Sequence, residues 1–192
     1  MRKILWTCLC LLTVMFGWGA PAASAYDMKP VAFVVLDHTD QVTATVYREW
    51  RQQVKQAYYA PNYIVENNDN FGLQASEVIA KTGKSTSKLE RADLRAIAEA
   101  TGTQVVALVA VNRMEEVPLM MMHSPWDDDN SDWVRVYTSA DIYLYKYAED
   151  KMLKKHIRDV DTKETPNVTH PETLIKWELR KVANTMENRP QI

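Results

Sequence analysis

The chain has almost no cysteine, and this absence excludes several kinds of site. Only Cys8 and Cys10 are present among its 192 residues, and both lie in a segment that we expect to be removed on export. The exported protein would then have no disulfide, no thiolate metal site and no cysteine nucleophile. The sequence also lacks a P-loop, a G-x-G-x-x-G stretch, a G-x-S-x-G turn and an H-E-x-x-H motif. These absences disfavour the common nucleotide-binding, hydrolase and zinc-hydrolase classes.

The first 25 residues predict a cleaved export signal. Residues 2–3 are basic, residues 4–18 form an apolar stretch, and Ala-Ser-Ala at 23–25 is a small-x-small cleavage site. We therefore expect the exported chain to begin at Tyr26. The alternative is an uncleaved membrane anchor, but two glycines and a proline within 17–21 interrupt the apolar stretch before it reaches the roughly 20 residues that a span requires.

Neither cysteine fits a lipid-attachment site. Trp6 and Thr7 precede Cys8, and Leu9 precedes Cys10, where lipoprotein signals place small residues. We therefore expect a soluble product that is periplasmic or secreted, with no membrane span after cleavage. Without the signal the chain has 21 basic and 25 acidic residues, a net charge of about −4. No basic patch of the density that nucleic acid requires is present, so we expect no nucleic-acid partner.

Residues 87–113 predict a helix, a glycine stop and a buried strand. Ser87, with Glu90 three residues later, matches a capping box at a helix start. Gly102 stands where a left-handed residue ends many helices. The apolar run at 105–111 is too short for a second helix and is typical of a strand covered on both faces.

Apolar periodicity predicts the other elements and an α/β (α+β) fold. The expected order is β-α-β-α-α-β-β-β-α, with a single mixed sheet and helices packed on it, in one domain over residues 26–192. The strand at 152–160 is mostly polar and rich in lysine, which suits a sheet edge. The expected strands are 31–36, 63–65, 105–111, 133–147 and 152–160, and the expected helices are 41–59, 73–81, 87–101 and a last one opened by Pro171.

The segment 114–132 is predicted to be a long loop with a binding role. It contains two prolines, three consecutive methionines and an acidic run, and long connections without a pattern are usually functional or disordered. A calcium loop would need glycine and glutamate where the chain has Asp132 and Thr138. Consecutive methionines in an extended segment face alternate sides, which disfavours a copper site. We therefore assign no cofactor and no metal.

The strand at 133–147 alternates between apolar residues on one face and tyrosines on the other. A row of tyrosines supplies the aromatic area that is enriched in protein interfaces. The alternative is that a helix covers this face and that the rings belong to the core. The candidate partner-binding residues are Met121, His123, Trp126, Asp127, Asp128, Asp129, Tyr137, Tyr143 and Tyr145.

Four local sequences carry a family resemblance. They are VAFVVLDHTD, YIVENNDN, ADLRAIAEATGTQVVALVAVNRM and VRVYTSADIYLYKYAEDKMLKKHIRDV. Together they resemble the α/β domain shared by the curli-secretion channel subunit, the lipoprotein activators of penicillin-binding proteins and the amino-terminal domain of TolB. The resemblance spans about residues 30–186 and implies non-enzymatic envelope work without catalytic residues. The chain departs from these families in lacking their usual lipid-attachment cysteine and in its 114–132 segment.

These observations predict an exported, non-enzymatic envelope protein that docks to, or helps assemble, another envelope component. The alternative is a secreted protein that binds a metal or small ligand through residues 114–132. A third hypothesis, a hydrolase built around His38, would need a Ser, Asp or Glu beside that histidine in a concave pocket. The sequence does not predict an oligomeric state.

Overall fold

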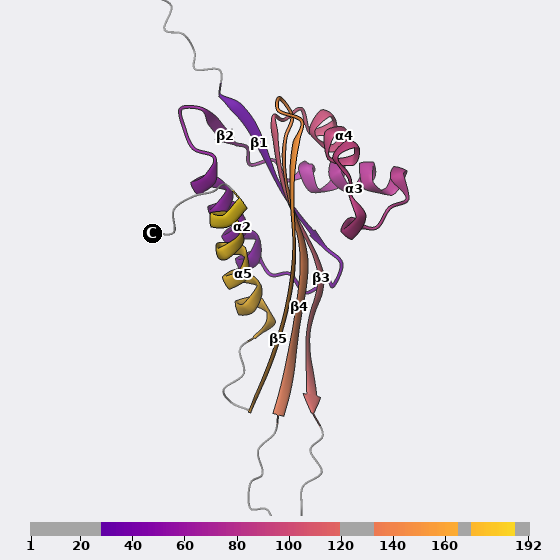
Figure 1. The fold of residues 1–192 in the computed structure, drawn as a ribbon, viewed down its shortest axis with the longest axis vertical. Helices are drawn as coiled ribbons and strands as arrows, with labels where there is room; N and C mark the ends of the chain where they lie inside the picture. The colour runs from indigo at the N-terminus through magenta and orange to yellow at the C-terminus, as the bar shows by residue number, and fades with distance from the viewer. Residues whose placement is uncertain (1–27, 120–132, 165–169, 187–192) are drawn as a thin grey trace, which may run out of the picture.

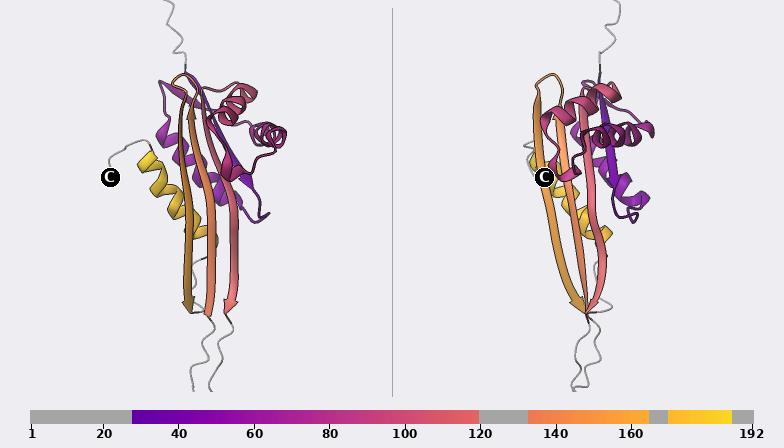
Figure 2. Two further views of the ribbon diagram at one scale, coloured as in Figure 1. Left: turned by 45° about the vertical axis from the view of Figure 1, so that its right-hand side comes forward. Right: turned by 90° about the vertical axis from the view of Figure 1, so that its right-hand side faces the viewer.

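The computed structural model describes residues 28–119, 133–164 and 170–186, and it confirms the predicted fold class and element order. A single five-stranded sheet, in the order β2-β1-β3-β4-β5, lies between two layers of helices (Figures 1 and 2). The predicted export signal lies outside the described residues. The strands are β1 (Lys29–Asp37), β2 (Tyr63–Val65), β3 (Val105–Leu119), β4 (Trp133–Lys146) and β5 (Lys151–Glu164), and the helices are α2 (Ala44–Ala57), α3 (Asn70–Thr82), η1 (Thr86–Lys88), α4 (Arg91–Thr101) and α5 (Pro171–Met186).

The sheet is mixed because its two halves are connected differently. β1 pairs in parallel with β2 and with β3, through crossovers that contain α2 on one face and α3 with α4 on the other. β3, β4 and β5 then run antiparallel to one another. As expected from its lysines, β5 forms one edge of the sheet.

Each face of the sheet has its own core. The α2 and α5 side buries Trp50, whose indole N–H donates to the Ala107 carbonyl at 3.2 Å. The Arg180 guanidinium of α5 makes a bidentate contact of 2.7 and 2.9 Å with Glu49 of α2, which joins the two helices. The α3 and α4 side buries Leu94 and Ile97 against the central strands. The central strands are covered on both faces, as their continuous apolar runs predict.

The predicted capping box at Ser87 is wrong, because the helix starts later. Ser87 lies within η1, and the N-cap of α4 is Glu90. The Glu90 backbone N–H donates to the Asp93 carboxylate at 2.8 Å, so the box is formed by these two acids instead. Gly102 ends α4 in the left-handed conformation (φ +67°), as predicted.

β3 extends well beyond the predicted end at Asn112, and residues 114–119 are strand, not loop. A register shift between Val111 and Arg113 marks a β-bulge at Asn112, beyond which β3 stays paired with β4 as far as Leu119. β1 ends opposite Val111, so no described strand lies on the other side of Pro118. A proline is tolerated there because that side of β3 is an edge. β3, β4 and β5 therefore project beyond the helices (Figures 1 and 2).

Candidate partner-binding face

Two of the predicted contact tyrosines belong to the core. Tyr143 and Tyr145 are 0% exposed and pack with α3 and α4 residues on one face of the sheet. The Tyr143 hydroxyl donates to the Thr86 carbonyl at 2.7 Å, and the Tyr145 hydroxyl donates to the Asp150 carboxylate at 2.8 Å. Burial raises the pKa of both phenols. These two residues cannot form an exposed contact surface, because the helices cover them.

Tyr137, the third predicted contact tyrosine, lies on the same side of β4 but beyond the helices. Its ring is half-buried, and the Arg113 guanidinium carbon is 3.9 Å from the ring centroid. Cross-strand partners point to the same face, so the register defines what surrounds it. We call this surface the open face, formed by Arg113, Glu115, Val117, Leu119, Trp133, Arg135, Tyr137, Ser139, Arg158, Val160 and Thr162.

The open face mixes apolar and basic side chains. Val160, directly opposite Tyr137, is 45% exposed. Arg113, Ser139 and Arg158 form one cross-strand row next to these residues. A hollow of about 260 Å³ lies over this row. The face therefore combines aromatic, aliphatic and guanidinium groups, which is the composition that protein interfaces favour.

A chain of hydrogen bonds forms the boundary between the open face and the core. Asp141 is 1% exposed, and its carboxylate accepts from the Asn112 amide at 2.7 Å and contacts His156 Nδ1 at 3.0 Å. The side-chain Oδ1 of Asn112 accepts from the Thr86 hydroxyl at 3.4 Å, and this hydroxyl also lies 3.1 Å from His38 Nε2. The buried polar groups of this chain are thus paired with one another.

A pocket does lie beside His38, but its polar groups are engaged in local contacts. The hollow, of about 420 Å³, is lined by Ser76 and Asp37 among others. The Ser76 hydroxyl donates to the Gly72 carbonyl at 2.8 Å, and the Asp37 carboxylate accepts from the backbone of Val42 at 2.8 Å. Burial alone would raise the pKa of Asp37, but these backbone hydrogen bonds hold it below its ordinary value. The serine and the carboxylate serve the fold here, so the geometry does not favour the hydrolase hypothesis.

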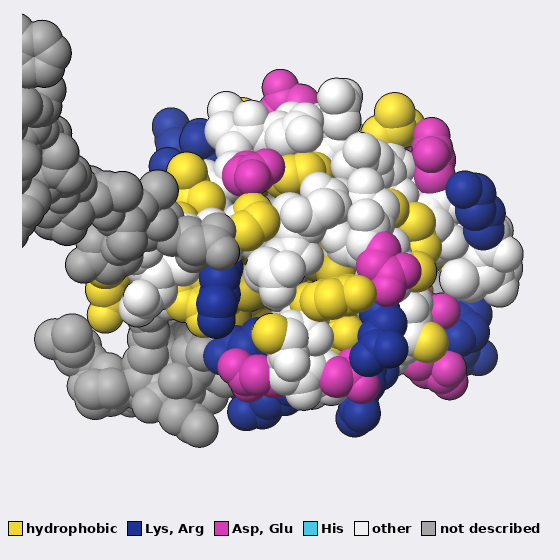
Figure 3. All heavy atoms as spheres, turned by 90° about the horizontal axis from the view of Figure 1, so that it is seen from above, with side chains coloured by type: hydrophobic (Ala, Val, Ile, Leu, Met, Phe, Trp, Pro, Cys, Tyr) yellow, Lys and Arg dark blue, Asp and Glu magenta, His cyan; other side chains and the backbone are white. Residues whose placement is uncertain are grey.

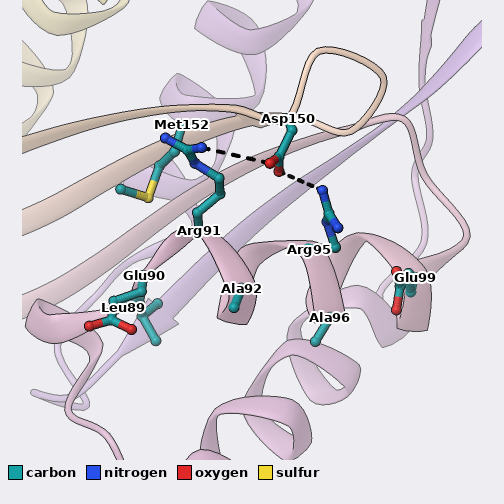
Figure 4. A pocket seen from close by; sticks show the side chains of 9 residues that line it. All are labelled: Leu89, Glu90, Arg91, Ala92, Arg95, Ala96, Glu99, Asp150 and Met152. Atoms are coloured by element: carbon teal, nitrogen blue, oxygen red, sulfur yellow. Dashed lines mark ion pairs between the residues drawn. The ribbon is translucent and has the colours of Figure 1, made fainter.

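A hollow of about 590 Å³ joins α4 to the turn between β4 and β5 (Figure 4). Arg95 Nη2 lies 2.9 Å and Arg91 Nη1 3.7 Å from the Asp150 carboxylate. Asp150 adopts a positive φ of 46°, which is uncommon outside glycine. The hydrogen bond from the Tyr145 hydroxyl has the largest effect among the contacts that lower the pKa of Asp150. These charges hold the turn against the helix, and we interpret the residues around this hollow as a structural contact between α4 and the turn.

Figure 3 views the molecule from the end that carries this contact and shows basic and acidic side chains next to one another along part of the rim. Lys84, for example, contacts Glu90 at 3.0 Å and Asp93 at 2.9 Å. Lys84 is therefore paired with acids of α4 in this part of the described surface. On the open face, the basic row contains Arg158, which has no ion-pair partner among the described residues.

The predicted contacts Met121, His123, Trp126, Asp127, Asp128 and Asp129 lie outside the described residues. Leu119 and Trp133, which flank them, are cross-strand partners at the far end of β3 and β4. Within the described parts of the chain, no group of three or more His, Asp or Glu side chains could hold a metal ion.

The sequence analysis did not predict that four residues of the open face and its boundary lie next to one another. They are Arg113, Ser139, His156 and Arg158. Alternation did place Ser139 on the tyrosine side of β4, and it placed two of the others on a polar edge strand. Which residues of β5 lie opposite which residues of β4 depends on the strand register, and only the structure provides it.

No protein-family model matches the chain, and no curated protein matches it. Solved structures do. The hypothetical protein CT253 from Chlamydia trachomatis aligns with 10% identity and a TM-score of 0.46, over 84% of this chain and 96% of that one. Lipoprotein GNA1162 from Neisseria meningitidis aligns with 15% identity and a TM-score of 0.37, over 83% and 99%. The LpoB C-terminal domain from Salmonella enterica aligns with 10% identity and a TM-score of 0.30, over 74% and 87%.

The structural matches include LpoB, one of the activator lipoproteins of penicillin-binding proteins that the sequence resembles. Because all of these TM-scores are below 0.5, the matches assign no partner and no activity to this chain. In the described ranges no helix combines the length and the apolar character that crossing a membrane requires.

Proposed function

We propose that the protein is an exported, non-enzymatic envelope protein that docks another envelope protein through its open face. One observation carries the proposal: three long strands continue past the helices and leave one face, centred on Tyr137 and Val160, that no described helix covers. Sheets normally bury such side chains, and grouped exposed apolar residues mark interaction sites.

The composition of the open face supports a protein partner. Tyrosine, tryptophan and arginine are the residues that contribute most to protein interfaces. Tyr137, Trp133 and Arg113 lie on this same face, and the Arg113–Tyr137 stack holds those two side chains in place. Rigid aromatic and guanidinium groups lose little conformational freedom when a partner binds.

The described histidines are engaged in local polar contacts. His38 is hydrogen-bonded to Thr86, His156 to Asp141 and His170 to Glu116. In the described ranges none of the three is hydrogen-bonded to a serine hydroxyl, which is the pairing that an activated serine nucleophile requires. Each histidine is instead part of a local polar contact.

The test is site-specific photocross-linking in the native envelope. A photoreactive phenylalanine analogue replaces Tyr137 or Val160 on the open face, and Leu73 of α3 or Trp177 of α5 as controls. All four positions carry large side chains that are accessible, and the controls are 62% and 49% exposed. We expect one discrete protein adduct from positions 137 and 160, and none of the same mass from the controls.

Equal adducts at all four positions would show non-specific contact and contradict the proposal. Adducts from Leu73 or Trp177 alone would move the docking surface to the helices. A folded protein with no adduct at 137 or 160 would show that the open face does not dock the partner.

A further inference from the structure

The hollow over the open face is lined by basic groups from neighbouring strands. Its volume is about 260 Å³. Basic side chains from β3 and β5 and a hydroxyl from β4 meet there, with an aromatic ring and an aliphatic side chain alongside. The residues that matter for the argument are Arg113, Tyr137, Ser139, His156, Arg158 and Val160.

The strand register places two arginines on either side of one small hydroxyl. Arg113 is the cross-strand partner of Ser139 on one side, and Arg158 is its partner on the other. Directly opposite residues have Cβ atoms about 5 Å apart, so the two arginine stems stand about 10 Å apart. Because Ser139 is small, it leaves space between two like charges that repel each other when nothing lies between them.

The two guanidinium groups have different surroundings. Arg113 stacks on the Tyr137 ring and forms an ion pair with Glu115, so it is held in place and its charge is compensated. For Arg158, the described residues provide neither an ion pair nor a hydrogen bond. Arg158 therefore supplies the uncompensated positive charge of the hollow.

The other titratable groups that line the hollow have contacts of their own. His156 uses Nδ1 for the buried Asp141 carboxylate, which leaves its Nε2 for the hollow. Asp159 accepts from the Val160 backbone N–H at 2.9 Å. Lys181 of α5 lies on the other side of the sheet. Its pKa is raised mainly by Glu178 and, to a smaller extent, by the charge of Asp159.

We infer that this hollow binds a single carboxylate of the docked protein, either an Asp or Glu side chain or a chain terminus; the inference rests on the function proposed above. A guanidinium presents paired N–H donors whose spacing matches a carboxylate. One uncompensated arginine suits a monovalent carboxylate better than a doubly charged phosphate. Tyr137 and Val160 at the rim provide apolar contact for the methylene groups that carry the carboxylate.

The test is an NMR titration of the ¹⁵N-labelled protein with N-acetyl-glutamate α-amide, a monovalent carboxylate. We expect saturable shifts of the Ser139, His156 and Arg158 backbone signals. The uncharged probe N-acetyl-glutamine amide should not reproduce them. Inorganic phosphate at matched ionic strength should bind more weakly. Equal shifts with the glutamine probe, tighter binding of phosphate, or no saturable shift would each overturn the carboxylate inference.

Two variants that each remove one positive charge distinguish binding at the hollow from general attraction by the electrostatic field of the protein. Arg158→Gln should weaken binding of the carboxylate probe about tenfold or more, because it removes a charge-assisted hydrogen bond. Lys155→Gln removes the same charge from the same strand, but Lys155 pairs with Ile142 on the opposite face. It should change binding by less than about twofold. Similar losses in both variants would show general electrostatic attraction and overturn the site.

The cross-linking experiment distinguishes this inference from the docking proposal. Arg158→Gln combined with the photoreactive group at Tyr137 should lower the adduct yield about tenfold, in line with the probe. An unchanged yield overturns the carboxylate inference and leaves docking intact. If the protein with native Arg158 gives no adduct, docking fails by itself, and the probe titration alone decides whether the hollow binds a carboxylate.

Discussion

Tyr143 and Tyr137 occupy equivalent positions on one strand face and have opposite surroundings. Both point to the same side of β4, six residues apart. Tyr143 lies under the helical layer with its hydroxyl bonded to Thr86, whereas Tyr137 lies beyond η1 among arginines and an exposed valine. A repeating side-chain pattern along a strand therefore does not define one surface. The extent of the helices divides the pattern into a structural half and an accessible half.

Truncating the two tyrosines should separate these halves most strongly. Tyr143→Ala should lower the free energy of unfolding by roughly 3–5 kcal/mol, because it leaves a cavity and an unpaired Thr86 carbonyl. Tyr137→Ala should cost less than about 1 kcal/mol, since its ring is only half-buried. Urea unfolding followed by circular dichroism measures both. Similar losses in the two variants would contradict the division.

The next comparison is between Arg113 and Met114, which follow the bulge at Asn112. Because the bulge shifts the register, Met114 is buried on the α5 side and Arg113 is exposed on the open face. Met114→Ala should destabilise by roughly 2–4 kcal/mol, and Arg113→Ala by less than about 1 kcal/mol. The same unfolding assay applies. The reverse order would mean that β3 continues without the bulge.

The contact between α2 and α5 predicts how the stability of the covered half depends on pH. Hydrogen bonds from Arg180, which outweigh the effect of burial, lower the pKa of Glu49. A carboxyl group with a lowered pKa stabilises the fold above its ordinary pKa, and this contribution disappears as the pH falls through the folded-state pKa. Glu49→Gln should therefore cost about 1 kcal/mol at pH 7, a modest value because Arg180 is largely exposed.

The difference between wild type and Glu49→Gln should shrink as the pH is lowered below the ordinary glutamate range. Urea titrations at pH 7, 5 and 3 measure it. Glu178→Gln, which removes a half-buried carboxylate of α5 whose partner Lys181 is exposed, is the control and should show a smaller difference at every pH. A Glu49→Gln difference that stayed constant down to pH 3 would show that the carboxylate charge is not what stabilises this contact.

The sequence predicts the fold well because its local patterns agree with each other. Continuous apolar runs gave β1 and the first part of β3, the left-handed Gly102 gave the end of α4, and Pro171 gave the start of α5. Lysines on the last strand identified the sheet edge. Each of these signals depends on a few neighbouring residues, and each acts in the same direction as the others.

The candidate site was harder to predict because it depends on non-local relations. The bulge at Asn112 breaks the alternation of β3, so the sequence pattern predicts a strand end there and a loop around Pro118. Tyr137 and Tyr143 have the same local sequence signal, and only the positions of α4 and η1 separate them. The Arg113–Ser139–Arg158 row crosses three strands and requires the register of both pairings.

The central claim is that the open face, and not the helical surface, captures the partner. Its most direct test is affinity capture from the native envelope with two single-aromatic variants, Tyr137→Ser on the open face and Trp177→Ser on α5. Both lose one accessible aromatic ring, and the melting temperature of each must first be shown to match wild type. We predict that Tyr137→Ser loses most of the partner protein captured by wild type, while Trp177→Ser retains it. Full capture by Tyr137→Ser, or loss with Trp177→Ser, would contradict the account.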